Sequence, residues 1–137
     1  MREIIFRGKR TDNGEWVEGN LVQFPHRVTI MSDGFAEVKP ETVGQYIGLK
    51  DKKGRKIFEG DVVHAIHKED YVGLKNTDFG YGVIEYNGTY YGRAAWEINI
   101  IGETGSRIFS EGLEVEIVGN IHDKASPDMY AEQIGWF

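Results

Sequence analysis

The chain has 137 residues, a length typical of one domain, and a core of that size is stable without a disulfide or metal. It has no cysteine, which excludes a disulfide framework and thiolate zinc sites. Its formal net charge of −6 disfavours general binding to a phosphate backbone. No apolar run is long enough for a signal-peptide core or a membrane span, so we expect a soluble protein that is not exported by a standard signal.

Turn-forming dipeptides divide short apolar stretches along the chain, a pattern typical of β-hairpins. Such a turn needs positive φ at its central residues, which asparagine, aspartate and glycine adopt at low cost. We predict four hairpin turns, at Asn13-Gly14, Asp33-Gly34, Lys53-Gly54 and Asn87-Gly88. Proline at position 40 predicts a single helical turn over residues 40–43.

The stretch Gly48–Val63 reads GLKDKKGRKIFEGDVV and predicts two sharp turns between short strands. Asp51 is suited to accept hydrogen bonds from the backbone of its own turn, and Gly54 supplies positive φ. A second turn is expected at Glu59-Gly60-Asp61, followed by a strand that begins at Val62. This alternation of strand and turn is typical of a small barrel or a meander.

The second half of the chain continues the pattern. Residues 68–82 are interpreted as a long loop, whereas Trp96, Ile98 and Ile100 share one face of a predicted strand. Residues 113–117 alternate apolar and acidic side chains, which predicts a strand with one buried and one wet face. No sustained helical stripe occurs, and a short helix at residues 126–134 is the longest one predicted.

These elements predict a mostly β fold with at most short helices. We divide it into an N-terminal β-hairpin region at about residues 1–45, a barrel-like β unit at about 46–122 and a tail at 123–137. The barrel-like unit is expected to be small and SH3-like or related to that architecture.

Three stretches resemble the YopX family, whose members are encoded largely by bacteriophages and prophages. The longest is Glu41–Val63, ETVGQYIGLKDKKGRKIFEGDVV, and the others are Met1–Arg7 and Val118–Asp123. The resemblance implies a mostly β fold, a phage or prophage origin and a cytoplasmic site of action in the host. It implies no established activity and no site residues. Residues 64–112 hold no landmark of the family.

Residues with catalytic or metal-binding chemistry are few and dispersed. His64 and His67 are three positions apart, so a strand would direct them to opposite faces, and we predict no metal site. Glu59 and Asp61 are expected to bond turn amides rather than to form an acid–base pair. No nucleophile elbow, P-loop or dinucleotide fingerprint occurs. We therefore predict that the protein is not an enzyme and uses no cofactor.

Aromatic residues are concentrated between residues 71 and 96. A candidate aromatic and basic binding surface comprises Tyr71, Tyr81, Tyr90, Tyr91 and Arg93. Small barrels can stack single-stranded bases on such a surface. The same aromatics can instead form the core or cross-strand pairs, or anchor a protein interface.

The C-terminal residues Ile134, Trp136 and Phe137 are too apolar to be left in water, so we predict that they contact a second copy or fold back. The segment 96–101 would also promote association if it lay at a sheet edge. The preferred hypothesis is a phage accessory protein that acts by protein–protein contact or self-assembly, as a homo-oligomer or with an unknown protein partner. The alternative is a nucleic-acid-binding small β-barrel.

Overall fold

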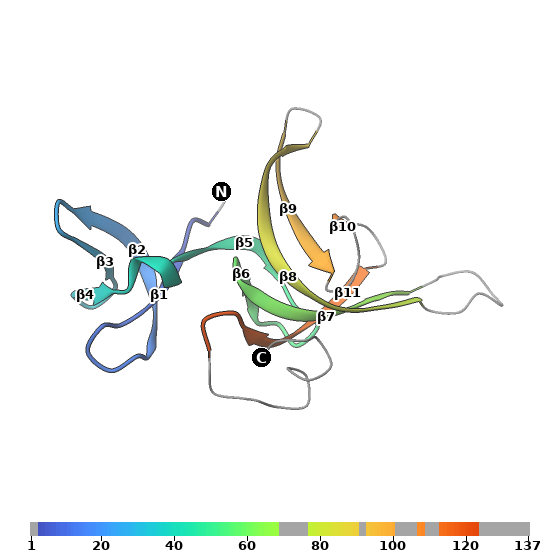
Figure 1. Ribbon diagram of the computed structural model, residues 1–137, viewed down its shortest axis with the longest axis horizontal. Helices are drawn as coiled ribbons and strands as arrows, with labels where there is room; N and C mark the ends of the chain where they lie inside the picture. Colours follow the sequence, from blue (N-terminus) through green and yellow to red (C-terminus); the bar gives the residue numbers. More distant parts are fainter. Residues whose placement is uncertain (1–2, 69–76, 91–92, 101–106, 109–112, 124–137) are drawn as a thin grey trace. The chain divides into compact units, whose positions relative to one another are not determined.

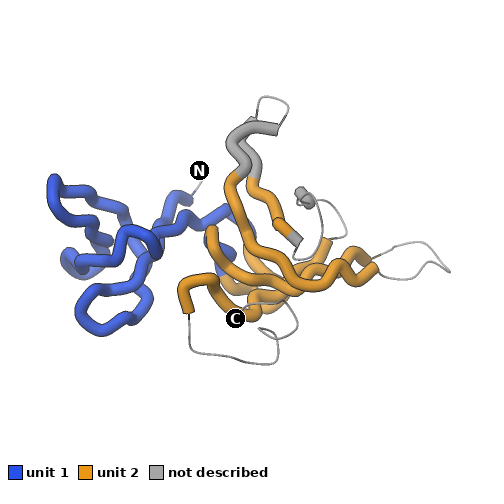
Figure 2. Tube along the Cα trace, in the orientation of Figure 1, with its two compact units in different colours: residues 1–49, 56–58 blue, residues 50–55, 59–137 orange. Residues whose placement is uncertain are grey.

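The computed structural model describes residues 3–68, 77–90, 93–100, 107–108 and 113–123, and these are mostly β-strand (Figure 1). No α-helix occurs in this part of the chain, so the mostly β prediction is confirmed. No helix in it could cross a bilayer. The chain forms two compact units: unit 1 is residues 1–49 and 56–58, and unit 2 is residues 50–55 and 59–137 (Figure 2).

The elements are listed here in chain order. They are β1 (Phe6–Lys9), β2 (Trp16–Phe24), β3 (Arg27–Met31), β4 (Phe35–Val38), a 3-10 turn η1 (Pro40–Thr42), β5 (Gly44–Lys50), β6 (Lys56–Phe58), β7 (Asp61–His67), β8 (Thr77–Tyr90), β9 (Arg93–Ile100), β10 (Arg107–Ile108) and β11 (Leu113–Asn120). The single helical turn predicted after Lys39 is therefore confirmed. The helix predicted over residues 126–134 lies outside the described residues.

Unit 1 contains a six-stranded sheet with the order β4-β3-β2-β1-β5-β6. Gly14 (φ 74°) and Gly34 (φ 145°) lie in the turns between β1 and β2 and between β3 and β4, as the turn signals predicted. The outer edge of β4 forms backbone hydrogen bonds with the residues at and just after the end of β1. The amide of Thr11 donates to the Glu37 carbonyl (3.0 Å), and the amide of Lys39 donates to the Lys9 carbonyl (2.9 Å).

The core of unit 1 lies inside this curled sheet. Ile30 and Val38 are completely or almost completely buried there, at 0% and 1% exposure. Two glycines permit the curl: a Cβ on Gly8 would lie 3.0 Å from Val38, and one on Gly19 would lie 2.2 Å from the Met31 carbonyl oxygen. Glycine at position 19 is therefore required by close backbone approach.

Unit 2 contains a five-stranded antiparallel sheet with the order β10-β9-β8-β7-β11. Its core side chains come from four neighbouring strands and are buried: Val63, Ala65, Ile84, Ile98 and Val115. In the described residues β10 and β11, at the two ends of the order, do not pair with each other. The barrel-like unit predicted from the sequence is therefore an open sheet here, because closure requires the end strands to pair.

Two local predictions in unit 2 are wrong. Asn87-Gly88 does not end a strand; β8 continues to Tyr90, and the dipeptide falls at a bulge between Tyr86 and Thr89. An Asn-Gly pair favours positive φ, and this backbone conformation occurs in bulges as well as in turns. Residues 77–82, predicted as loop, form the first part of β8.

Candidate functional site

The stretch Gly48–Val63 is organised by the carboxylate of Asp51, which is completely buried. Its Oδ1 accepts hydrogen bonds from the amides of Lys53 (3.0 Å) and Arg55 (2.9 Å). Its Oδ2 accepts from the amide of Ile117 (3.0 Å) and from Nε of Arg55 (3.0 Å). Burial alone would raise the pKa of Asp51, but these bonds outweigh it and the pKa is lowered.

The second turn of this stretch contacts the end of β11 and the residue that follows it. The Gly60 carbonyl accepts a bond from the amide of Ile121 (3.0 Å), and Asn120 Nδ2 donates to Asp61 Oδ1 (3.0 Å). Gly60 has φ 88°, which favours glycine. The side-chain oxygen Oδ1 of Asn120 also accepts a hydrogen bond from the amide of His122 (2.9 Å). Asp61 thus bonds to a side chain 59 residues away, a contact that local reasoning about the turn did not predict.

Of the three stretches that carry the resemblance, Glu41–Val63 contacts both of the others, through the pairing of β5 with β1 and through the bonds of Gly60 and Asp61 to Ile121 and Asn120. A family model described as YopX protein matches residues 5–126. The chain belongs to the YopX family. No curated protein and no solved structure matches it. In this YopX chain the family signature forms a structural junction between the Asp51 turn, the Gly60 turn and β11.

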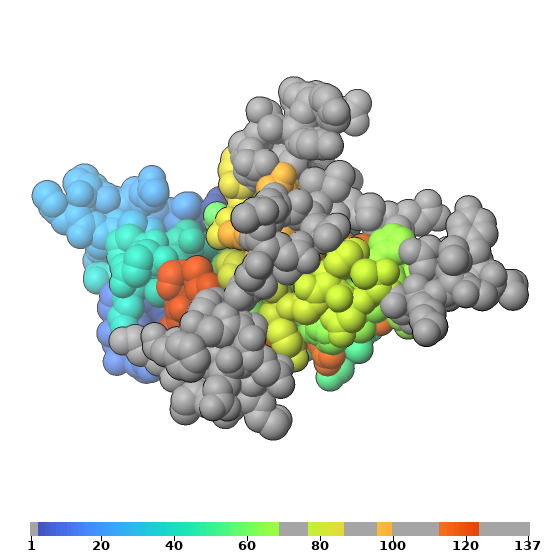
Figure 3. Space-filling view, turned by 45° about the vertical axis from the view of Figure 1, so that its right-hand side comes forward, coloured from blue at the N-terminus to red at the C-terminus, as the bar shows by residue number. Residues whose placement is uncertain are grey.

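The predicted aromatic and basic surface is only partly within the described residues. Tyr81 lies on β8, where its ring stacks on His64 of β7 at a centroid distance of 5.1 Å. Tyr90 and Arg93 are Cα partners at the end of the β8–β9 hairpin. Tyr71 and Tyr91 lie outside the described part of the chain. Strands β7 and β8 pair with each other, and Figure 3 shows their green and yellow-green residues next to one another.

The histidine on which Tyr81 stacks is paired with a carboxylate. Nε2 of His64 is 2.8 Å from Oδ1 of Asp78, and Glu116 is the Cα partner of His64 on the other side of β7. The amide of Gly80 donates to Asp78, and that bond, together with His64, lowers the pKa of Asp78. A bulge in β8 between the partners of Ala65 and Ile66 brings Asp78 to His64. The Asp78 carboxylate does not attract a phosphate backbone to this position.

The two histidines considered as metal ligands make separate contacts. His64 pairs with Asp78, whereas His67 lies beside the ring of Phe79 at 6.4 Å. Within the described ranges, no three His, Asp or Glu side chains are grouped closely enough to hold a metal ion.

A surface that the sequence analysis missed lies on β2, β3 and β4 of unit 1. We define the β2–β4 face as Phe24, Arg27, Met31 and Phe35. Cross-strand pairing of Phe24 with Arg27 and of Met31 with Phe35 places these side chains on one face. Phe24, Met31 and Phe35 are 38%, 37% and 59% exposed. Large apolar side chains gathered on one exposed face are a feature of protein-interaction sites.

The rings and the cation of this face contact one another. Phe24 and Phe35 pack edge to face with centroids 5.9 Å apart, and the guanidinium of Arg27 lies 4.9 Å from the Phe24 ring centroid. The sequence contains a pattern that could have indicated this face. Ile30 and Val38 occupy the alternate positions that are buried in their strands, whereas Met31 and Phe35 occupy the positions that point the opposite way.

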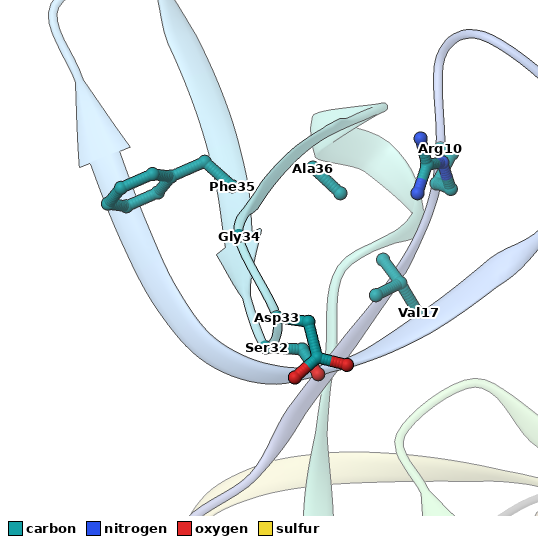
Figure 4. Close-up of a pocket in the computed structure, with 7 residues that line it drawn as sticks. All are labelled: Arg10, Val17, Ser32, Asp33, Gly34, Phe35 and Ala36. Carbon is teal, nitrogen blue, oxygen red and sulfur yellow. The ribbon is translucent and has the colours of Figure 1, made fainter.

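A cavity of about 320 Å³ adjoins the same hairpin, lined by Arg10, Val17, Ser32, Asp33, Gly34, Phe35 and Ala36. Figure 4 shows Phe35 pointing away from Arg10, so its ring belongs to the β2–β4 face rather than to the cavity. Arg10 bonds to Asp12 at 2.9 and 2.8 Å, which raises the pKa of Arg10 and lowers that of Asp12. This cation is thus already paired.

The remaining predicted contact residues do not converge on these surfaces. Ile134, Trp136 and Phe137 lie outside the described residues. Within the segment 96–101, Glu97 and Ile98 are paired with β8 on one side and with β10 on the other. Strand β9 is therefore internal in the sheet at these two residues.

Proposed function

We propose that this YopX protein is a phage or prophage accessory protein that acts in the host cytoplasm by self-association and not by catalysis. The observation that carries the proposal is the β2–β4 face. Family membership supports the phage setting through the origin that the resemblance implies. The argument for self-association rests on the composition of the face and on the charge of the whole chain.

The β2–β4 face has the composition of an interface centre. Aromatic residues, methionine and arginine are enriched at protein interfaces and supply most hot spots. Complete burial of a large apolar side chain is worth about 1.5–3 kcal/mol, and the three apolar side chains here retain between 37% and 59% of their exposure. Covering them removes a substantial apolar area from water.

The local charge at the β2–β4 face allows a second copy to bind there. With a net charge of −6, most surfaces of two copies repel each other. The β2–β4 face differs, because its cation Arg27 is balanced by the exposed Glu37 on the same side of β4. In a two-fold dimer the Arg27 guanidinium of one copy can lie on the Phe35 ring of the other. A contact of this kind would occur twice about the two-fold axis, as in an isologous interface.

The absence of catalysis is part of the same proposal. One member of the candidate acid–base pair, Asp61, is 1% exposed and bonded to Asn120, and the candidate metal ligand His64 is bonded to Asp78. The nucleic-acid alternative is less favoured, because the net charge is −6 and Tyr81 stacks on a histidine that is paired with the carboxylate of Asp78. Oligonucleotide binding that weakens steeply with salt would favour that alternative.

The test is the mass in solution, measured by light scattering across a range of concentrations. We expect the wild-type protein to approach twice the chain mass of 15.6 kDa and Phe35→Ser to remain monomeric. The matched control is Leu49→Ser, which removes another exposed apolar side chain of unit 1 (45% exposed) outside the face. A wild-type protein that stays monomeric at high concentration, or a Phe35→Ser dimer, contradicts the proposal.

A further inference from the structure

The outer edge of β11 is covered by a turn instead of by a strand. In an antiparallel pair, the N–H and C=O of one residue point to the same side, and successive residues alternate. The backbone N–H and C=O groups of Val115 and Ile117 point away from β7, because they bond to residues of the Asp51 turn. The amide of Lys52 donates to the Val115 carbonyl (2.9 Å), and the amide of Ile117 donates to Asp51 (3.0 Å).

A third bond completes this cover. Nη2 of Arg55 donates to the Ile117 carbonyl (2.8 Å). An amide, a carboxylate and a guanidinium thus supply the donors and the acceptor that a neighbouring strand would supply. The turn itself is closed by the bond from the Asp51 amide to the Arg55 carbonyl (2.8 Å) and by Gly54 at φ 81°.

The side chains of the turn are also complementary in charge to those of β11. Lys52 and Lys53 place their ammonium groups 3.3 and 2.8 Å from the carboxylate of Glu116, which lowers the pKa of Glu116. Lys68 lies 3.4 Å from Glu114, the other acid on this side of β11. A ligand that replaced the turn would therefore need backbone donors for Val115 and Ile117 and cations for the two acids.

We propose that the outer edge of β11 is a latent strand-addition site, which the Asp51 turn closes as an intramolecular occupant. Its ligand is an extended peptide with lysine or arginine at alternate positions. Addition of a strand to a sheet edge is a common mode of peptide recognition, in which main-chain bonds give affinity and side chains give specificity. The site lies in unit 2 and does not depend on the β2–β4 face.

The control point is Asp51. This one buried carboxylate fixes both the shape of the turn and its bond to Ile117. Asp51→Ala should release the cover while leaving the core of unit 2 unchanged. Arg55→Met is a milder second variant, because it removes the bond to the Ile117 carbonyl and retains the carboxylate. Asp12→Ala is the matched control, since it removes an arginine-paired aspartate of unit 1.

The experiment combines hydrogen exchange of the full chain with fluorescence anisotropy of two labelled peptides, an alternating Lys-Val heptamer and an alternating Glu-Val heptamer. We expect the Ile117 amide to exchange at least about tenfold faster in Asp51→Ala, with exchange in β7 and β8 unchanged. The Lys-Val peptide should bind this variant at least about tenfold more tightly than it binds the wild type. Bound peptide should restore protection of the Ile117 amide.

Three results overturn the proposal. The first is an Ile117 amide that stays protected in both Asp51→Ala and Arg55→Met. The second is a Glu-Val peptide that binds as tightly as the Lys-Val peptide. The third is equal binding of the Lys-Val peptide by Asp51→Ala and Asp12→Ala. If Asp51→Ala does not fold, Arg55→Met takes its place, with smaller changes in the same direction.

Discussion

Replacement of Asp51 by asparagine tests the energetic role assigned to the family signature. The substitution keeps the shape of the side chain and removes its charge. An amide oxygen in place of Oδ1 can still accept from Lys53 and Arg55. The amide nitrogen in place of Oδ2 would face two donors, the amide of Ile117 and Nε of Arg55, so both of those bonds are lost.

The expected cost follows from these bonds. A hydrogen bond to a charged group contributes about 1.5–3 kcal/mol, and breaking a buried ion pair costs about 3–5 kcal/mol. Arg55 is about half exposed and water can solvate it, so the loss of its ion pair with Asp51 costs an amount at the low end of these ranges. We expect Asp51→Asn to lower the free energy of unfolding by about 2–4 kcal/mol at neutral pH, against a total of about 5–15 kcal/mol for a domain.

The pH dependence has a definite sign. The folded pKa of Asp51 is below its ordinary value, so the carboxylate stabilises the fold fully above the unfolded pKa of about 3.9. This contribution is lost as the pH falls through the lowered folded pKa. The difference in stability between the wild type and Asp51→Asn should therefore be largest at neutral pH and shrink below about pH 4.

The assay is urea unfolding followed by circular dichroism, at a series of pH values from 7 down to 2. Asp12→Asn serves as the control, because Asp12 pairs with Arg10 at an exposed position and its loss should be too small to resolve. An Asp51→Asn variant as stable as the wild type at pH 7 would refute the reasoning. So would a stability difference that does not shrink as the pH falls.

Further substitutions test the close approaches in each unit by the same unfolding assay. Gly19→Ala should destabilise unit 1 by about 1–3 kcal/mol or more, because its Cβ would lie 2.2 Å from the Met31 carbonyl oxygen. Asn120→Ala should cost about 1–3 kcal/mol, since it leaves buried Asp61 without its amide donor. Gly60→Ala should cost about 1–2 kcal/mol from its positive φ alone, because the nearest atom lies 3.5 Å from the added Cβ.

A matched comparison checks the last of these predictions. Gly14 also has positive φ (74°), and a Cβ there would meet nothing within 4 Å. Gly14→Ala should therefore cost about as much as Gly60→Ala. A much larger cost for Gly60→Ala would mean that packing against Asn120 and Ile121 dominates there. A Gly19→Ala variant as stable as Gly14→Ala would contradict the close approach to Met31.

Local features of the fold were predictable because local chemistry decides them. Asn13-Gly14, Asp33-Gly34 and Lys53-Gly54 form turns where positive φ is needed, and Pro40 begins the 3-10 turn. Asn87-Gly88 carries the same preference but forms a bulge, because pairing of β8 with β9 continues past it. A dipeptide favours a local backbone conformation. Whether the strand pairing continues past it depends on the partner strand.

The sites depend on contacts that sequence patterns do not encode. The role of Asp51 includes a bond to Ile117, 66 residues later, so its turn could be predicted but not its position at the edge of β11. The β2–β4 face was missed because Phe24 and Phe35 meet only when the sheet has formed. Alternation divides a strand into two faces, and only the tertiary structure determines which face is buried.

The separation in sequence between the Gly60 turn and β11 also has a consequence for how the chain folds. Unit 1 is complete once residue 58 has been synthesised. Strand β7 can pair with β8 soon afterwards, but its other edge lacks a partner until β11 emerges, since Asp61 and Asn120 are 59 residues apart. Contacts between distant residues form slowly, because the intervening loop must first be closed. We therefore expect unit 1 to fold early during translation, while the nascent β7 presents an unpaired edge to the cell until the last strand arrives.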